Sequence, residues 1–298
     1  MLHMTTRRVS PTVPTRRVAS TLRMYRERKG MGVGEAAAAV DHQSSWLSRI
    51  EGMENRPHPN DVQALLMQYD VEQPIIEAVK AVARQSRKRG WWYPYHDVLP
   101  DWFGQYLGLE SDASTIRAFD GLAVPGLLQT EEYARAMVQA LVTRQSSAEI
   151  DRFTRLRIER QQRITDDEDP VQFRAVLDEG LLWRQVGGRQ VMIEQIERLL
   201  EVGQRPNVEI QVVPSSAGAH AGMDGSFVVM DFPPLPTPFP TIDDRIAYVD
   251  LLVGAKYFDN PAEVAPYEAV WEQLRGDALS SDESDALLRR IAKRLAAH

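Results

Sequence analysis

The sequence predicts an all-α N-terminal domain followed by a larger α+β domain. Over residues 16–86, apolar residues recur at the three- and four-residue spacing of short helices. Residues 97–298 combine helical segments with strand-like runs that do not alternate regularly with them. The chain has 298 residues, 43% apolar and 26% charged, which is an ordinary globular composition and long enough for two domains.

Five short helices are expected in the N-terminal domain, after a flexible basic arm over residues 1–15. The first helix spans 16–29, where Val18, Leu22 and Tyr25 share one face, and Gly30 ends it. The other four are expected over 33–40, over 43–51, around 62–69, and from Pro74 to Val82. Helices this short bury little surface alone, so they indicate one compact helical domain over 16–86.

Residues 87–96 form a linker and an aromatic junction before the second domain, which covers 97–298. Seven of the 23 aromatic residues fall between Trp91 and Tyr106. This block packs as a hub between the domains, or it contacts a partner or ligand, for which the candidates are Trp91, Trp92 and Trp102.

The second domain is expected to contain helices over 131–142, 148–164, 190–202, 261–275 and 282–296, and strands over 173–177, 208–213, 226–232 and 246–252. Residues 233–240 (PPLPTPFP) are expected to be a stiff surface loop. Such a loop spaces two strands, or it presents a polyproline segment to a partner.

Charge is divided unevenly along the chain. Residues 1–90 contain 15 lysines and arginines against 9 acidic residues, whereas the remainder contains 20 against 33. A basic module on an acidic body favours a polyanionic partner at the N-terminal end. Cysteine is absent, which excludes disulfides, thiol nucleophiles and zinc–thiolate sites. We expect a cytoplasmic, nucleoid-associated protein, because no apolar run resembles a signal peptide or a membrane span.

Residues 33–52 have the spacing of a helix-turn-helix. Ala37 is small enough for two helices to cross closely, and Asp41 occupies the turn position that requires a positive φ angle. Leu47 and Ile50 anchor the second helix from beneath. Its outward face carries Gln43, Ser44, Ser45, Ser48 and Arg49. Glutamine, serine and arginine read base edges in the major groove, although a solvated helix of an ordinary bundle has the same pattern.

Residues 18–70 resemble the Xre, or lambda-repressor-like, DNA-binding domain. LRMYRERKG (22–30) is similar to its first helix, and WLSRIEG (46–52) to the end of its recognition helix. The resemblance implies that residues 43–45 and Arg49 face bases or phosphates, and that Val33 opens the helix next to the DNA backbone. Trp46 departs from the usual small polar residue; it stacks on sugar-phosphate, touches a thymine methyl, or packs locally.

DNA affinity is expected to come mainly from phosphate contacts and therefore to fall with added salt. The candidate phosphate contacts are Arg16, Arg17 and Arg56. Arg7 and Arg8, together with Arg16 and Arg17, follow a minor groove or belong to a disordered solubilising tail. We expect a homodimer whose two recognition helices, about 34 Å apart, read a pseudo-palindromic operator on double-stranded DNA.

Signals for catalysis are poor, and we expect no enzyme, no cofactor and no metal site. GMGVG (30–34) lacks the preceding strand of a phosphate-binding loop. The acidic run 166–169 either attracts a cation or forms a solvated turn. In the loop 218–227, His220 and Asp224 either form an acid–base pair that contacts a ligand or partner, or belong to a tight connection between strands.

From about Trp92 onward, the chain resembles the C-terminal domain of actinobacterial WhiJ-like regulators. The phrases that carry the resemblance lie at 97–110 (DVLPDWFGQYLGLE), 124–136, 205–227 and 249–264. It implies an antitoxin-like transcriptional regulator whose C-terminal domain engages a small protein encoded nearby. Two alternatives stay open: the same DNA-binding regulator under small-molecule control through its C-terminal domain, and, more remotely, a DNA-tethered enzyme.

Overall fold

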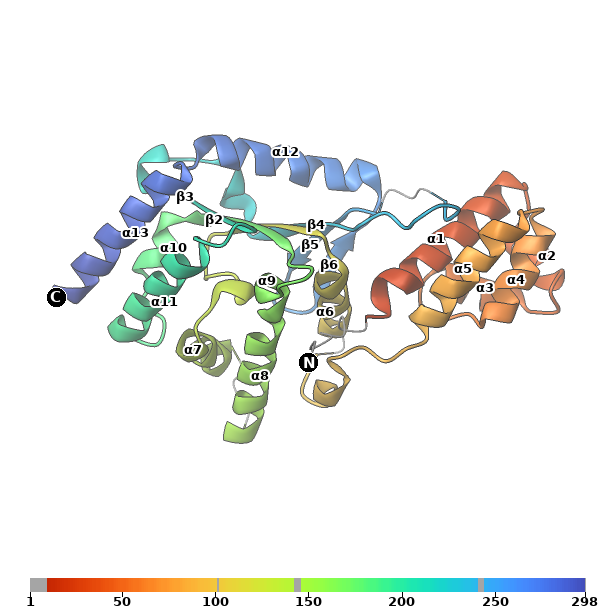
Figure 1. The fold of residues 1–298 in the computed structure, drawn as a ribbon, viewed down its shortest axis with the longest axis horizontal. Coiled ribbons are helices and arrows are strands. Elements are labelled where there is room, and N and C mark those ends of the chain that lie inside the picture. Colours follow the sequence, from red (N-terminus) through yellow and green to blue (C-terminus); the bar gives the residue numbers. More distant parts are fainter. Residues whose placement is uncertain (1–9, 101, 142–145, 241–243, 298) are drawn as a thin grey trace. The chain divides into compact units, whose positions relative to one another are not determined.

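The structure is a computed structural model and describes residues 10–100, 102–141, 146–240 and 244–297. The chain divides into two compact units (Figure 1). The N-terminal unit comprises residues 1–93 and 233–244, and the C-terminal unit comprises 94–232 and 245–298. No helix in the described ranges is long and apolar enough to cross a membrane.

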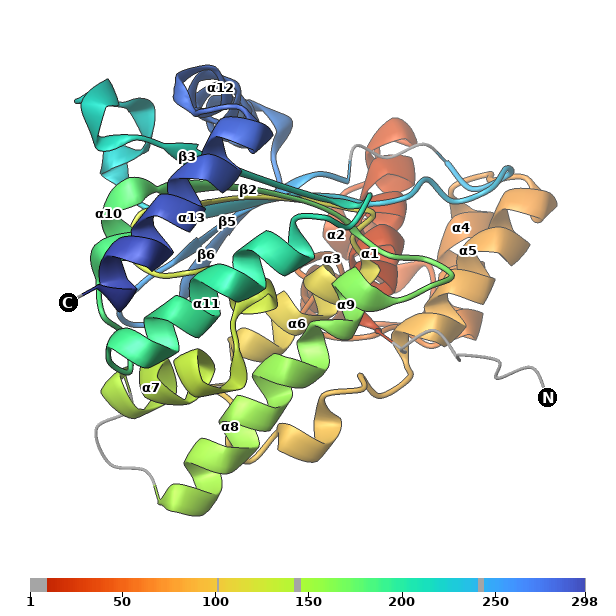
Figure 2. The same cartoon turned by 60° about the vertical axis from the view of Figure 1, so that its left-hand side comes forward.

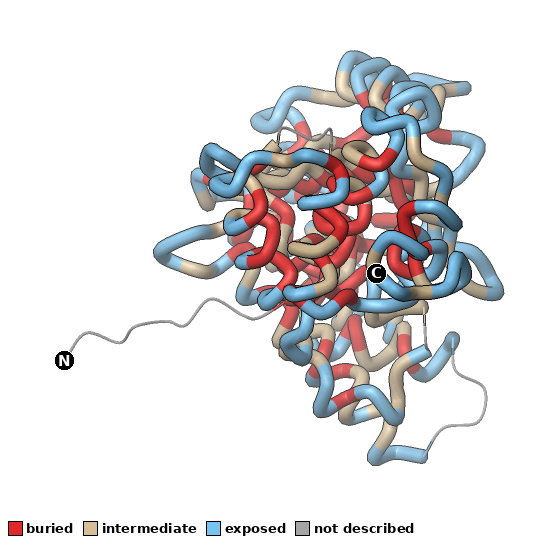
Figure 3. Tube along the Cα trace, turned by 90° about the vertical axis from the view of Figure 1, so that its right-hand side faces the viewer, coloured by how far each residue is buried: buried red, intermediate tan, exposed pale blue. Residues whose placement is uncertain are grey.

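The N-terminal unit is a helical domain. Its helices are α1 (Thr12–Arg28), α2 (Val33–Ala38), α3 (Ser44–Glu51), α4 (Pro59–Gln68) and α5 (Gln73–Ser86). Each helix contributes apolar side chains to one core, including Leu22, Ala37, Leu47, Leu65 and Ile76, all at most 1% exposed. Figure 3 shows buried positions alternating with exposed ones along these helices, as expected for amphipathic segments around a shared interior.

The first helix begins four residues earlier than predicted, so residues 12–15 do not belong to a flexible arm. Val13 is 2% exposed, and the Thr15 hydroxyl donates a hydrogen bond of 2.7 Å to the Pro11 carbonyl. Burial of this first turn explains why it is ordered despite its weak apolar periodicity. Residues 1–9 of the expected arm, including Arg7 and Arg8, lie outside the described residues.

The segment 233–240 is not a free surface loop, as the sequence suggested, but part of the N-terminal unit. Phe239 is 8% exposed and lies in the helical core, and Leu235 packs against the same core. The Arg17 guanidinium donates to the Pro233 carbonyl and to the Asp244 carboxylate, both at 2.6 Å. Residues some two hundred positions apart thus complete one core.

The C-terminal unit is built on a six-stranded mixed sheet of order β3-β2-β1-β4-β5-β6. Strands β1, β2 and β3 are parallel, whereas β1, β4, β5 and β6 are joined by antiparallel pairings. The strands are β1 (Thr115–Asp120), β2 (Gln172–Asp178), β3 (Val208–Val213), β4 (Phe227–Asp231), β5 (Ile246–Asp250) and β6 (Ala255–Phe258). The sequence predicted four of them and missed β1 and β6.

Helices cover both faces of this sheet (Figure 2). They are α6 (Phe103–Asp112), α7 (Glu131–Leu141), α8 (Ser147–Arg160), α9 (Gln162–Thr165), α10 (Glu179–Trp183), α11 (Arg189–Val202), α12 (Pro261–Asp277) and α13 (Ser281–Ala296). Helix α12 covers one face, where its Trp271 is fully buried against Phe119 and Val229. Helices α6, α7 and α8 lie on the opposite side (Figure 1).

The period-two alternation of strands decides what each face carries. In β1, Phe119 packs in the core beneath α12, so Ile116, Ala118 and Asp120 point to the opposite face. In β5, Ala247 belongs to the α12 core, whereas Tyr248 and Asp250 point the other way. The opposite face therefore ends in acidic side chains at the edge where β1 and β5 finish.

Candidate functional site

Helices α2 and α3 meet in a helix-turn-helix. Ala37 is fully buried where they cross, and the His42 amide donates to the Ala37 carbonyl at 2.9 Å. Asp41 has φ 60°, the left-handed conformation expected at this turn position. This geometry ends α2 and sets the direction in which α3 leaves the turn.

The outward face of α3 is open. Gln43, at the N-cap, and Ser44, Ser45, Ser48 and Arg49 are all exposed, whereas Leu47 and Ile50 are buried. The Arg49 guanidinium makes no hydrogen bond or ion pair with any residue the structure describes. A helix with buried anchors and an unengaged polar face presents its side chains to a partner.

A buried ion pair fixes α3 against α1. Arg26 donates to both carboxylate oxygens of Glu51, at 2.7 and 2.8 Å, and also to the Met31 carbonyl at 3.0 Å. This hydrogen bonding with Glu51 outweighs burial and raises the pKa of Arg26 above its ordinary value. Arg23 adds a hydrogen bond to the Glu51 backbone carbonyl. The bidentate contact holds the C-terminal end of α3 in a defined orientation.

Trp46 packs locally, one of the three alternatives left open by the sequence. Its ring stacks on His42 with centroids 3.7 Å apart and planes inclined by 10°. The side chain is half-buried against the helical core, as is Val33, which opens α2. Both side chains therefore contribute to packing in the helical core.

Two of the predicted phosphate contacts are wrong. Arg16 is 6% exposed and Arg17 is 8% exposed, and Arg17 is engaged by Asp244 and the Pro233 carbonyl. Because their charges are used inside the N-terminal unit, neither guanidinium is presented to a phosphate. Arg56 is exposed, as a phosphate contact requires, and its own carbonyl accepts from Arg87.

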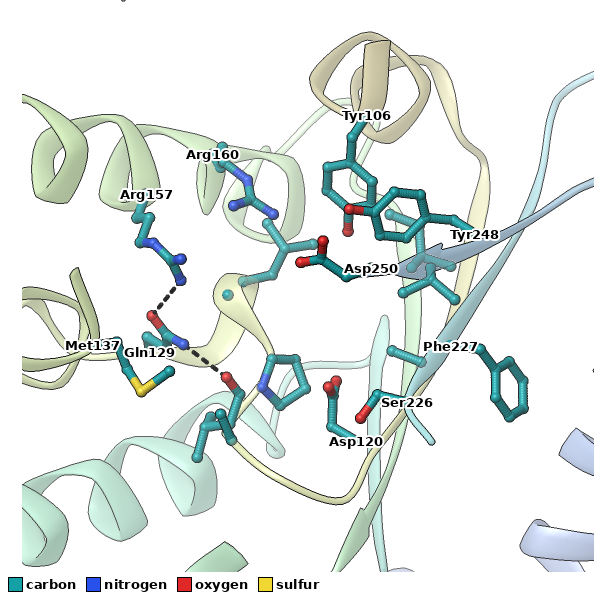
Figure 4. A pocket seen from close by; sticks show the side chains of 18 of the residues that line it. Tyr106, Asp120, Gln129, Met137, Arg157, Arg160, Ser226, Phe227, Tyr248 and Asp250 are labelled. Carbon is teal, nitrogen blue, oxygen red and sulfur yellow. Dashed lines mark hydrogen bonds between the residues drawn. The ribbon is translucent and has the colours of Figure 1, made fainter. Parts of the chain in front are cut away.

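A second candidate site is a cavity of about 210 Å³ in the C-terminal unit, on the sheet face opposite α12 (Figure 4). Its apolar wall comes from α6, α7 and the sheet, and includes Phe103, Tyr106, Leu127, Met137 and Phe173. Its polar lining consists of Asp120, Gln129, Arg157, Arg160, Ser226, Tyr248 and Asp250. A few polar groups in an apolar wall are typical of a small-molecule site.

Three neighbouring strands place two carboxylates in one row. Extending the pairing Phe119↔Phe227 by one residue puts Ser226 opposite Asp120, and extending Val228↔Tyr248 by two puts Asp250 opposite Ser226. Strands lie about 4.8 Å apart, so the two aspartate backbones are about 10 Å apart with the serine between them. In Figure 4 both carboxylates point into the cavity.

The charged groups of the cavity form no direct ion pair, although Arg157 and Asp250 attract each other at longer range. Burial raises the pKa of Asp120 to about 7, and burial also raises the pKa of Asp250. Burial, with repulsion from Arg160, lowers the pKa of Arg157 to about 10, so this guanidinium stays charged at neutral pH. Asp120, Asp250 and Arg157 have no ion-pair partner within 4 Å among the described residues. Within the described part of the chain, Arg157 donates a hydrogen bond only to the Gln129 side-chain carbonyl, at 3.2 Å.

Arg160, in contrast, is fully paired. It donates to both oxygens of Glu110 at 2.7 and 2.8 Å, and the two side chains are 5% and 2% exposed. Its guanidinium also lies 5.3 Å from the ring centroids of Phe103 and Tyr106. Burial opposes this charge, but Glu110 outweighs that effect and raises the pKa of Arg160. The pair fixes α6 to α8 and forms a rigid wall of the cavity.

Two family models match the chain. Residues 103–290, more than half of the sequence, match the model described as "Domain of unknown function (DUF5753)". The chain belongs to the DUF5753 family. Residues 17–78 match a model described as "Helix-turn-helix domain", in agreement with the geometry of α2 and α3. No curated protein and no solved structure matches the chain.

None of the predicted ligand contacts lines the cavity of the DUF5753 domain. Trp91, Trp92 and Trp102 are half-buried elsewhere, and the aromatic block reaches the cavity through Phe103 and Tyr106 instead. The Trp102 carbonyl accepts a hydrogen bond from the Tyr257 hydroxyl at 3.2 Å. The tryptophans were predicted as members of the aromatic block, whereas the position of α6 decides which rings of that block face the cavity.

His220 does not pair with Asp224. Its Nδ1 accepts from the Gly222 amide, so Nε2 carries the proton and donates to Asp178 at 3.2 Å. Asp224 is exposed. His220 caps the short 3-10 turn Ala221–Asp224, which gives the loop a structural explanation.

The acidic run 166–169 forms a turn. Asp166 accepts from the amides of Glu168 and Asp169 at 2.9 and 3.1 Å, and these hydrogen bonds lower the pKa of Asp166. Within the described ranges, no cluster of three or more His, Asp or Glu residues has the arrangement of a metal site.

Asp120 and Asp250 were missed by sequence reasoning. Each is the last residue of a short alternating strand, TIRAFD and IAYVD, and the second run was predicted as a strand. Two strands that end in aspartate are a weak signal by themselves. Only the strand order, which places β4 between them, brings the carboxylates into one row.

Proposed function

We propose that this DUF5753 protein is a sequence-specific transcriptional regulator that inserts α3 into the DNA major groove. The observation that carries the proposal is the exposed face of α3, on which Arg49 has no partner among the described residues. A free guanidinium beside serines and a glutamine matches the side chains that read base edges. The basic N-terminal third of the chain supplies attraction to phosphates.

The N-terminal unit is proposed to act as an Xre-type domain in a homodimer. Two copies of α3 separated by about one helical turn, 34 Å, would read a pseudo-palindromic operator. An eight-residue recognition helix contacts only a few base pairs, so a single copy supplies little specificity. Exposed Arg56 remains a candidate phosphate contact in this arrangement.

The DUF5753 domain is proposed to bind a small partner protein, in the antitoxin-like manner implied by the resemblance to WhiJ-like actinobacterial regulators. An exposed apolar tip supports this proposal. In the connection between β5 and β6, Leu251, Leu252 and Val253 are 51%, 103% and 88% exposed. Three adjacent apolar side chains left in solvent are typical of an interaction surface.

Small-molecule control is a second candidate, which the cavity favours. Unpaired charged groups in a half-buried apolar cavity are costly without a ligand, and a bound metabolite would offset that cost. Both candidates describe a protein without catalytic activity. If His220→Ala abolished a measurable turnover, the remote alternative of a DNA-tethered enzyme would replace them.

The decisive experiment is a gel shift on operator DNA, recovered by sequencing the fragments bound by the full chain. Arg49→Ala should remove the preference for the operator over a mismatched site, a loss of about 1–3 kcal/mol in the difference between the two binding free energies. The control is Arg84→Ala on α5, which removes the same charge from an exposed position outside the helix-turn-helix. Unchanged operator preference in Arg49→Ala would refute the assignment of α3 as the recognition helix.

Partner binding has its own test. Leu252→Ser should release a co-purifying small protein from the full chain, whereas Leu122→Ser, a substitution at another exposed leucine, should not. If both variants retain the partner, the tip between β5 and β6 is not its contact.

A further inference from the structure

We propose that the cavity of the DUF5753 domain binds a small zwitterion of amino-acid size, with its ammonium group at Asp120 and Asp250 and its carboxylate at Arg157. This inference rests on the proposed ligand-controlled regulator and names the class of ligand. The separation of the carboxylates from Arg157 and the apolar wall between them support this assignment.

The carboxylates define a cation-binding end. Asp120 and Asp250 flank Ser226 in one row across β1, β4 and β5, and both side chains point inward (Figure 4). Neither has a basic partner within 4 Å among the residues the structure describes. A ligand ammonium placed at this row would supply the missing positive charge and three hydrogen-bond donors.

Arg157 defines the opposite end. It comes from α8, on the other side of the cavity from Asp120, and its guanidinium is half-buried (Figure 4). One donor is satisfied by Gln129, whose own amide is held by the Val124 carbonyl at 2.7 Å. The remaining donors suit a carboxylate, which guanidinium groups bind in a bidentate manner.

The volume suits a small ligand body. A dry cavity of about 150 Å³ holds one benzene molecule. The 210 Å³ observed here accommodates one ring or a branched aliphatic chain, with room for a few polar atoms. The apolar wall, which includes Phe103, Met137 and Phe173, suits such a body.

The hydroxyl of Tyr248 adds a polar group beside the carboxylate row. Tyr248 is 5% exposed and lines the cavity, and its hydroxyl interacts with the Asp250 carboxylate. A ligand ammonium at Asp250 would lie within reach of this hydroxyl, which can accept a hydrogen bond from it. Its aromatic ring lies 4.5 Å from that of Tyr106, so both phenols are fixed by packing.

The cavity is linked to the N-terminal unit through the chain itself. Val228 on β4 and Tyr248 on β5 line the cavity, and these two strands lead into and out of residues 233–244. That segment ends in the N-terminal core through Phe239. A ligand that fixes β4 and β5 therefore fixes both ends of the segment 233–244, which belongs to the N-terminal unit.

The test is isothermal titration of the full chain, without DNA, against three matched probes: L-phenylalanine, 2-phenylethylamine and 3-phenylpropanoate. L-Leucine and L-methionine are titrated in parallel, because they vary the apolar body. We expect at least one of the three amino acids to bind. If L-phenylalanine binds, 2-phenylethylamine and 3-phenylpropanoate should each bind at least about tenfold more weakly than it does.

Charge-neutralising variants then assign the two ends. Asp120→Asn should weaken amino-acid binding about tenfold or more and leave any 3-phenylpropanoate binding unchanged. Arg157→Gln should weaken the binding of amino acids and of 3-phenylpropanoate and leave any 2-phenylethylamine binding unchanged. Asp224→Asn, at an exposed aspartate outside the cavity, should bind as the unmodified chain does. Circular dichroism confirms that each variant is folded.

Two results would overturn the proposal: no heat of binding with any of the three amino acids at about 10 mM, or binding that Asp120→Asn and Arg157→Gln leave intact. Saturable binding of Mg²⁺ at the two aspartates, with no amino-acid binding, would reassign the cavity. Since DNA is absent from the titration, a failed gel shift with intact amino-acid binding would refute DNA recognition and leave this site standing.

Discussion

Helix α3 and the cavity place their polar groups in opposite environments. Arg49 and the polar residues beside it on α3 are exposed, so water solvates them. Asp120 and Arg157 are half-buried, and burial disfavours their charged forms, so it raises the pKa of Asp120 and lowers the pKa of Arg157. An exposed polar face can therefore be altered at almost no cost in stability, whereas a charged cavity is coupled to folding.

The largest effect is expected where charge is buried and paired. Glu110→Ala would leave Arg160 unpaired beneath the cavity and should lower the free energy of unfolding by about 3–5 kcal/mol. Chemical denaturation followed by circular dichroism measures this change. Glu131→Ala, which breaks an exposed pair with Arg135, should cost less than about 1 kcal/mol. Equal losses in the two variants would mean that burial of the pair contributes nothing.

A slightly smaller effect is expected at the segment that joins the N-terminal core. Phe239→Ala removes a ring from that core and should destabilise it by about 3 kcal/mol. Hydrogen exchange should localise the loss to amides of α1 to α5, although the substitution lies among residues 233–244. If protection falls only in the C-terminal unit, Phe239 is not part of the helical core.

The cavity should make stability depend on pH. The groups facing Asp120 are Ser226, Asp250, and the phenols of Tyr106 and Tyr133. Because the folded pKa of Asp120 is about 7 and its unfolded pKa is about 4, the unfolded chain loses this proton first as pH rises. The stability contributed by the protonated form is complete below about pH 4 and is lost as pH rises through 7.

Asp120→Asn keeps a neutral group and removes this dependence. The free energy of unfolding of the variant, measured relative to that of the unmodified chain, should rise by about 1–2 kcal/mol as pH increases from 4 to 8. This figure is reduced because the carboxyl is partly exposed. Denaturation at matched pH values measures the difference. A constant difference across this range would show that Asp120 is ionised in the fold at all of them.

The smallest effect on stability is expected on α3. Ser45→Ala exchanges one exposed small side chain for another and should change the free energy of unfolding by less than about 0.5 kcal/mol. Operator affinity should nevertheless fall measurably in the same gel shift used for Arg49→Ala. A destabilisation of several kcal/mol would indicate that Ser45 packs within the unit and does not face DNA.

Sequence reasoning succeeded where the determining interactions are local. The spacing of Ala37, Asp41 and Leu47 predicted the turn, and the structure confirms the buried crossing and the positive φ angle. The same reasoning failed for Arg16 and Arg17, which were expected to meet phosphates. Their partners, Pro233 and Asp244, lie more than 200 residues away, where no local pattern points to them.

The sequence by itself determined the amphipathic helices, the polar face of α3 and the division between a helical and a mixed domain, because helix periodicity and turn chemistry act over a few residues. Tertiary structure decided the rest. It placed Asp120 and Asp250 in one row by setting β4 between β1 and β5, and it assigned Phe239 to a distant core. Strand order and core membership depend on the packing of the whole chain, so they have no local sequence signature.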